Sequence, residues 1–142
     1  MTVDMRSFLQ QIKKTNDIFI VKKRISTKYE IAAVTEKLDG SKAALFENVK
    51  GSKFKLISNL VGSRDRFAQA IGSKKSDINQ KIVKAISSAK KPKISASAKF
   101  FENSTNDISI LPVVTHFQNE SGPFITSSIT VSYTHLTLPT KA

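Results

Sequence analysis

Apolar residues near the N-terminus recur first at helical and then at strand spacing. Met5, Phe8, Leu9 and Ile12 lie three or four residues apart, which predicts an amphipathic helix over residues 4–14. β-branched and aromatic residues fill positions 18–21, which predicts a short buried strand over residues 17–21. The chain therefore begins with a helix followed by a strand.

A second helix is predicted after this strand. Thr27 is followed three residues later by Glu30, the pattern of a capping box. Ile31, Val34 and Leu38 then share one helical face, and the helix is expected to end near residues 39–40. Two apolar strands are expected over residues 43–48 and 55–61, separated by a turn at residues 50–52.

Two more helices complete the regular pattern. Ser63 is expected to cap a short helix that carries Phe67, Ala70 and Ile71 on one side and ends at Gly72. A further helix is expected over residues 76–88, and its predicted buried face holds four aliphatic side chains: Ile78, Ile82, Val83 and Ile86.

Helices and strands that alternate with short connections predict an α+β (mixed) fold, with an N-terminal α/β layered domain over residues 1–90. Residues 91–107 lack periodicity and are rich in serine, so we expect a linker there, before a second segment over residues 108–130. The predicted core has twelve members: Phe8, Leu9, Ile31, Val34, Leu45, Phe46, Leu56, Ile57, Phe67, Ile71, Ile82 and Ile86.

Composition narrows the class of protein. The chain has no cysteine, which excludes disulfides and zinc sites built on thiolates. Its apolar runs are all shorter than the roughly 18 residues of a membrane span, and no apolar signal core precedes Asp4 and Arg6. We therefore expect a cytoplasmic protein without a membrane span.

The formal net charge of +12 is large for 142 residues and can attract nucleic acid or anionic lipid. The cations are scattered over the ends of the predicted elements and are not interleaved with aromatic residues, as a base-stacking surface would require. We expect solvated lysines and no nucleic-acid partner. A stand-alone basic α/β module that binds nucleic acid is the alternative.

Few residues offer chemistry by themselves. The Gly62-Ser63 turn could present N–H groups to an anion, but no complete phosphate-binding motif accompanies it, so we expect ordinary helix capping. Glu47 lies in an apolar strand and is expected to pair with Arg64 or Arg66, as a structural ion pair. His116 has no second histidine before residue 135, and we expect a hydrogen-bonded structural role.

Six segments together resemble the UbiD family of decarboxylases. Residues 4–9, 30–34, 44–51 and 59–72 are similar, in order and spacing, to the N-terminal domain of that family. The segments LPVVTHF (residues 111–117) and GPFIT (residues 122–126) extend the similarity, which covers residues 4–129. The resemblance implies that residues 108–130 begin a flavin-reductase-like split β-barrel.

The resemblance also implies an activity, which is the non-oxidative decarboxylation of an aromatic or α,β-unsaturated carboxylic acid. The substrate classes left open are a quinone precursor, a phenolic acid and anhydromevalonate phosphate. In the family the cofactor is prenylated FMN, whose phosphate is anchored by Mn²⁺ and K⁺. The full-length enzyme is expected to be a homo-oligomer.

The resemblance assigns one site residue. Thr126 matches a family position near the flavin and is the predicted cofactor-binding residue. The family's metal-binding and catalytic residues follow the segment that ends at Thr126, so no catalytic or metal-binding residue is assigned in this chain. Glu120-Ser121 departs from the family's Asp and small residue.

The last residues are expected to be foreign to the protein. Residues 131–142 resemble a translated sequencing adaptor, so we expect a non-native tail there. On this interpretation the chain is an N-terminal fragment and is itself inactive.

Overall fold

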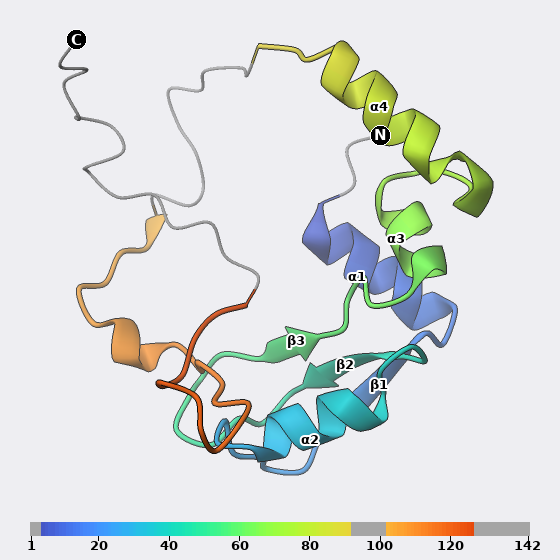
Figure 1. Ribbon diagram of the computed structural model, residues 1–142. Helices are drawn as coiled ribbons and strands as arrows, with labels where there is room; N and C mark the ends of the chain where they lie inside the picture. The colour runs from blue at the N-terminus through green and yellow to red at the C-terminus, as the bar shows by residue number, and fades with distance from the viewer. Residues whose placement is uncertain (1–3, 92–101, 127–142) are drawn as a thin grey trace, which may run out of the picture.

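The computed structural model describes residues 4–91 and 102–126 (Figure 1). The elements follow the predicted order, with two short 3₁₀ helices added. They are α1 (Met5–Lys14), β1 (Ile18–Val21), α2 (Glu30–Lys37), β2 (Ala43–Phe46), β3 (Leu56–Ser58), α3 (Arg64–Ala70), η1 (Lys75–Asp77), α4 (Ile78–Ser87) and η3 (Ile108–Ile110).

The sheet has three strands in the order β1-β2-β3. β1 and β2 are parallel, with Ile18 opposite Ala43, and α2 lies between them in the chain. β2 and β3 are antiparallel, with Leu45 opposite Ile57, and are joined by a turn that includes Gly51. This mixed sheet with helices confirms the predicted α+β class.

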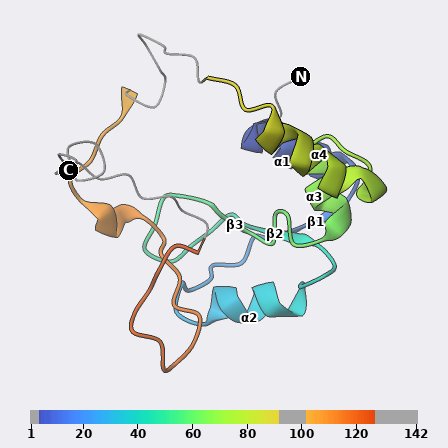
Figure 2. The same cartoon turned by 45° about the horizontal axis from the view of Figure 1, so that its top comes forward.

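Helices cover both faces of the sheet (Figure 2). Every residue of the central strand β2 is buried, and its side chains alternate between two core clusters. One cluster joins Ala44 and Phe46 to Ile31 of α2, and the other joins Ala43 and Leu45 to α1. The core is therefore two apolar layers on either side of one buried strand.

α1 has an N-terminal cap that was not predicted, and the predicted end of α3 at Gly72 is confirmed. The Asp4 carboxylate accepts hydrogen bonds from the N–H groups of Arg6 and Ser7, at 2.8 and 2.9 Å. Hydrogen bonds from the backbone N–H of Ser7 and then of Arg6 lower the pKa of Asp4. Gly72 follows α3 with φ of +64°, a conformation that costs glycine little.

The predicted capping box between Thr27 and Glu30 is wrong, because Glu30 bonds Ser26 and not Thr27. The helix begins at Glu30 because Tyr29 has φ of +67°, and Tyr29 makes no side-chain cap. The Glu30 carboxylate instead accepts a hydrogen bond from the N–H of Ser26 at 2.7 Å. Glu30 thus stabilises the turn before α2, and Thr27 does not cap the helix.

The predicted core is correct for the sheet and wrong for α4. Phe8, Ile31, Leu45 and Phe46 are buried, and Leu9, Val34, Leu56 and Ile57 pack against them partly buried. Phe67 and Ile71 are half-buried. On α4 only Ile78 is buried, whereas Ile82, Val83 and Ile86 are exposed, because the described part of the chain places nothing over that face.

Residues 102–126 return to the first domain. Val114 is buried in the core cluster that contains Phe46, and Ser52 donates a hydrogen bond to the carbonyl of Ile110 at 3.1 Å. Within the described residues this stretch contains η3 and an isolated bridge between Thr115 and Lys28, and no longer strand. The start of a split barrel stays a prediction, and residues 127–142 lie outside the description.

Candidate functional site

Thr126 lies at a cleft of about 660 Å³ between β3 and the second segment of the chain. One wall is formed by β3 and the loop that follows it, residues 59–62. The other wall is formed by residues 112–114 and 124–126. Thr126 is exposed and lines this cleft.

The second wall is held by a short parallel pairing with the turn before α2. The N–H of Thr115 donates to the carbonyl of Thr27 at 3.1 Å, and the carbonyl of Thr115 accepts from the N–H of Tyr29 at 3.0 Å. The neighbouring Val114 is 8% exposed. Two backbone hydrogen bonds and one buried side chain thus fix residues 113–115 against the domain.

Three polar side chains that line the cleft, Thr35, Ser58 and Asn59, take part in hydrogen bonds with each other or with the backbone. The Thr35 hydroxyl donates to the carbonyl of Ile31 and lies 2.8 Å from the hydroxyl of Ser58. The amide of Asn59 donates to the carbonyl of Thr35 at 3.0 Å. No local pattern in the sequence links these residues, because Thr35 and Asn59 are 24 positions apart.

His116 lies between this cleft and a second one of about 700 Å³. The His116 ring packs against Phe124, with the ring centres 5.3 Å apart. The backbone N–H of His116 donates a hydrogen bond to the Glu120 carboxylate at 2.5 Å. Nδ1 of His116 and Oε2 of Glu120 are buried without a hydrogen-bond partner among the described residues. The hydrogen bond expected of the His116 side chain is therefore not formed at Nδ1 among the described residues, and its ring packs against Phe124.

Glu120 closes the loop in which the chain departs from the family pattern. Its carboxylate bonds the N–H of His116, and the N–H of Phe124 donates to the carbonyl of Val114 at 3.3 Å. The longer carboxylate thus forms a turn between His116 and the segment that ends at Thr126.

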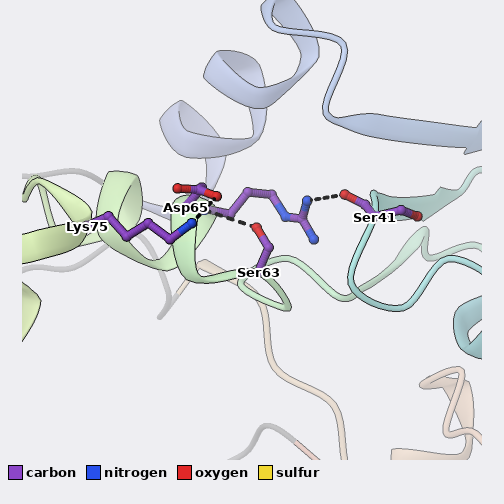
Figure 3. Close-up of polar contacts among 5 residues, drawn as sticks. Ser41, Ser63, Asp65 and Lys75 are labelled. Atoms are coloured by element: carbon purple, nitrogen blue, oxygen red, sulfur yellow. Dashed lines mark hydrogen bonds and ion pairs between the residues drawn. The ribbon is translucent and has the colours of Figure 1, made fainter.

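The Gly62-Ser63 turn begins α3 and positions a buried arginine (Figure 3). Ser63 Oγ accepts from the N–H of Arg66 at 3.2 Å, which confirms ordinary helix capping. The Arg66 guanidinium donates to the carbonyl of Ser41 at 2.6 Å and to that of Asn59 at 3.3 Å. Arg66 is only 2% exposed, so it ties α3 to the turns after α2 and β3.

The predicted ion pair of Glu47 with an arginine is wrong. Glu47 pairs with Lys55 at 2.8 Å, and Asp65 pairs with Lys75 at 3.0 Å. The hydrogen bond from Lys55 is the main cause that lowers the pKa of Glu47. The Arg66 guanidinium binds the backbone carbonyls of Ser41 and Asn59 instead.

The described part of the chain contains no group of three His, Asp or Glu side chains that could hold a metal ion. Across residues 4–91 and 102–126, no helix is long and apolar enough to cross a membrane.

Comparison with solved structures identifies similar enzymes. The UbiD-class enzyme HmfF from Pelotomaculum thermopropionicum, in complex with FMN, is 27% identical with a TM-score of 0.78. The match covers 83% of this chain and 28% of HmfF, so the chain spans less than a third of that relative. No curated protein sequence matches the chain.

Two structures with lower identity support the fold alone. An evolved dimeric form of HmfF in complex with prFMN is 24% identical with a TM-score of 0.70, and the match covers 83% of this chain and 29% of that one. The apo 3,4-dihydroxybenzoic acid decarboxylase AroY from Klebsiella pneumoniae is 19% identical with a TM-score of 0.55, and the match covers 59% of this chain and 20% of AroY.

A family model settles the relationship that the segments in the sequence suggest. Residues 9–86 match the model of the 3-octaprenyl-4-hydroxybenzoate carboxy-lyase N-terminal domain. This match covers more than half of the chain and includes α2, the whole sheet and α3. The chain therefore belongs to the UbiD family, through its N-terminal domain.

Proposed function

We propose that this chain is the N-terminal part of a carboxy-lyase that non-oxidatively decarboxylates an aromatic or α,β-unsaturated carboxylic acid. The match of residues 9–86 to the family's N-terminal domain carries the proposal. The likeness to HmfF, a UbiD-class enzyme, supports it. In this arrangement the chain forms a scaffold, and the reacting groups come from the rest of the enzyme.

Prenylated FMN is the proposed cofactor of the whole enzyme. The two structures of HmfF hold FMN and prFMN, which supports a flavin. The described residues fit a flavin only in part, since they offer the hydroxyl of Thr126 and an apolar cleft but no set of metal ligands. We therefore assign the proposed Mn²⁺ and K⁺ to other parts of the enzyme and derive no chemical step from this chain.

Three substrate classes fit the proposed reaction, namely a quinone precursor, a phenolic acid and anhydromevalonate phosphate. The name of the matching family model includes 3-octaprenyl-4-hydroxybenzoate, which is a quinone precursor. AroY is named for the decarboxylation of 3,4-dihydroxybenzoic acid, which is a phenolic acid. A homo-oligomeric enzyme in the cytoplasm is proposed as its working form, and the dimeric form of HmfF is consistent with an oligomer.

The proposal is tested with a complete enzyme that carries this chain as its N-terminal part. We expect the enzyme, loaded with prenylated FMN, Mn²⁺ and K⁺, to release carbon dioxide from at least one of the three classes of acid. Apoenzyme and heat-treated holoenzyme are the controls. The absence of release from all three classes would overturn the proposal.

Thr126→Ala is expected to weaken flavin binding by the complete enzyme about 2- to 10-fold, the effect of one lost hydrogen bond. The reason is that Thr126 lines the cleft and is exposed there. Thr126→Ser keeps the hydroxyl and is the matched control, with near-normal affinity expected in a fluorescence titration of FMN. Equal affinity of all three proteins would remove Thr126 from the cofactor site.

A further inference from the structure

The loop of residues 116–124 joins the two parts of one cleft wall. Residues 113–115 precede the loop and are fixed to the domain by the pairing of Thr115, and Thr126 comes two residues after the loop. Within this loop, residues 117–119 and 121 are exposed, whereas Glu120 is half-buried. The Glu120 side chain therefore lies against the protein in a turn that is otherwise in solvent.

The Glu120 carboxylate links the middle of the loop to its start. One oxygen, Oε1, accepts a hydrogen bond from the backbone N–H of His116 at 2.5 Å. The other oxygen, Oε2, is buried and has no hydrogen-bond partner among the described residues. A hydrogen bond to an ionised group is stronger than a neutral one, and shielding from water strengthens it further. This contact therefore restrains the loop where it leaves the fixed residues 113–115.

Two further contacts connect the loop to the residues that follow it. The N–H of Phe124 donates to the carbonyl of Val114 at 3.3 Å, and the rings of Phe124 and His116 have their centres 5.3 Å apart. Two residues of chain span at most about 7 Å, so the position of Phe124 limits where Thr126 can lie. A change in the path of the loop at His116 is thus passed on to Thr126.

We propose that Glu120 is a positioning residue for cofactor binding. By holding the backbone N–H of His116 it sets the path of residues 116–124 and thereby places Thr126 in the cleft. Glu120 is not among the described residues that line this cleft, so it acts through the loop and not by touching the cofactor. This positioning role rests on the proposed function, because it takes Thr126 as the contact with the flavin.

A purely structural role for Glu120 leads to a different expectation. Such a role would lower the free energy of unfolding and leave the flavin affinity of the folded protein unchanged. A positioning role instead couples Glu120 to Thr126, and a double-mutant cycle on these two residues measures that coupling.

The first test measures the affinity for FMN of a complete enzyme that carries this chain, by fluorescence titration. Glu120→Ala is expected to weaken binding about 2- to 10-fold and no more than Thr126→Ala, because it displaces that one contact. In the Thr126→Ala background the same change should alter the affinity less than about 2-fold, since the contact is already lost. Glu120→Gln keeps an acceptor oxygen at the same reach and should retain most of the affinity. Gln118→Ala shortens an exposed side chain of the same loop and should bind like the parent.

The second test needs no flavin and uses amide hydrogen exchange in the 142-residue chain. Glu120→Ala is expected to speed exchange at His116 and Phe124 at least about tenfold, because the loop opens more often. Thr115 is the control, since its N–H is bonded to the carbonyl of Thr27 outside the loop and should keep its rate. Unchanged exchange at His116, or equal acceleration at Thr115, would overturn the positioning role.

The two tests separate failure of the positioning role from failure of the proposed function. Reduced affinity of Thr126→Ala with normal affinity of Glu120→Ala, or losses that simply add in the double variant, would overturn the positioning role alone. Normal affinity of Thr126→Ala would remove Thr126 from the cofactor site and overturn the positioning role with it. A complete enzyme that shows the coupling but releases no carbon dioxide would overturn the proposed function alone.

Discussion

Phe46→Ala is expected to lower the free energy of unfolding by about 3–5 kcal/mol. Phe46 is fully buried in the central strand β2, where it packs in one cluster with Ile31 of α2 and Val114 of the second segment. Its removal leaves a cavity where three parts of the chain meet. Denaturant unfolding followed by circular dichroism measures the change.

The neighbouring strand offers a matched control. Phe19 of β1 is the same residue type in the same sheet but is 49% exposed. Phe19→Ala should cost less than about 1.5 kcal/mol, since half of its side chain already lies in water. Equal losses for the two variants would contradict the position of Phe46 in the core.

Arg66→Met is expected to lower the free energy of unfolding by about 2–4 kcal/mol, because it leaves the Ser41 carbonyl without its donor and removes one of the two donors to the Asn59 carbonyl, which keeps the N–H of Gly62. The guanidinium of Arg66 binds the carbonyls of Ser41 and Asn59 in a region where the side chain is 2% exposed. Methionine has similar length and keeps most of the apolar packing. The measurement is the same denaturant unfolding.

Two variants control for charge and position. Arg64→Met removes an exposed arginine from the same helix and should change stability by less than about 0.5 kcal/mol. Arg66→Lys keeps the charge but lacks the fork that reaches both carbonyls, so an intermediate loss is expected. A loss for Arg64→Met as large as for Arg66→Met would show that net charge, and not the two hydrogen bonds, is responsible.

Local signals in the sequence predicted most of the fold. The period of Phe8, Leu9 and Ile12 located α1, and Ser63 and Gly72 marked the two ends of α3. These features act within one turn of helix, so they can be interpreted without knowledge of the rest of the chain. The strands were also found, although β3 is shorter than the expected segment because only residues 56–58 pair with β2.

Contacts between distant residues could not be predicted in the same way. The periodicity of α4 gave its apolar face correctly, but a pattern cannot show whether Ile82 and Ile86 have anything to pack against. Glu47 was expected to pair with Arg64 or Arg66, whereas it pairs with Lys55, and Arg66 binds the carbonyl of Ser41, which is 25 positions away. Backbone carbonyls are available at every residue, so the sequence carries no sign of which one is used.

The candidate site was found partly from the family resemblance and partly from the structure. Its single predicted residue, Thr126, came from a resemblance to a family and not from a pattern of charges or spacings. The structure adds the cleft and the pairing of Thr115 with residues 27–29 that holds one wall. That pairing joins segments far apart in the chain, which explains why periodicity did not indicate it.

The most direct test of the central claim compares carbon dioxide release by the 142-residue chain and by a complete enzyme that contains it. Both proteins are given prenylated FMN, Mn²⁺, K⁺ and each class of acid under the same conditions. The account predicts turnover by the complete enzyme only, because this chain is proposed to supply a scaffold and one cofactor contact, at Thr126, while the reacting groups are proposed to come from the rest of the enzyme. Turnover by the 142-residue chain alone would contradict it.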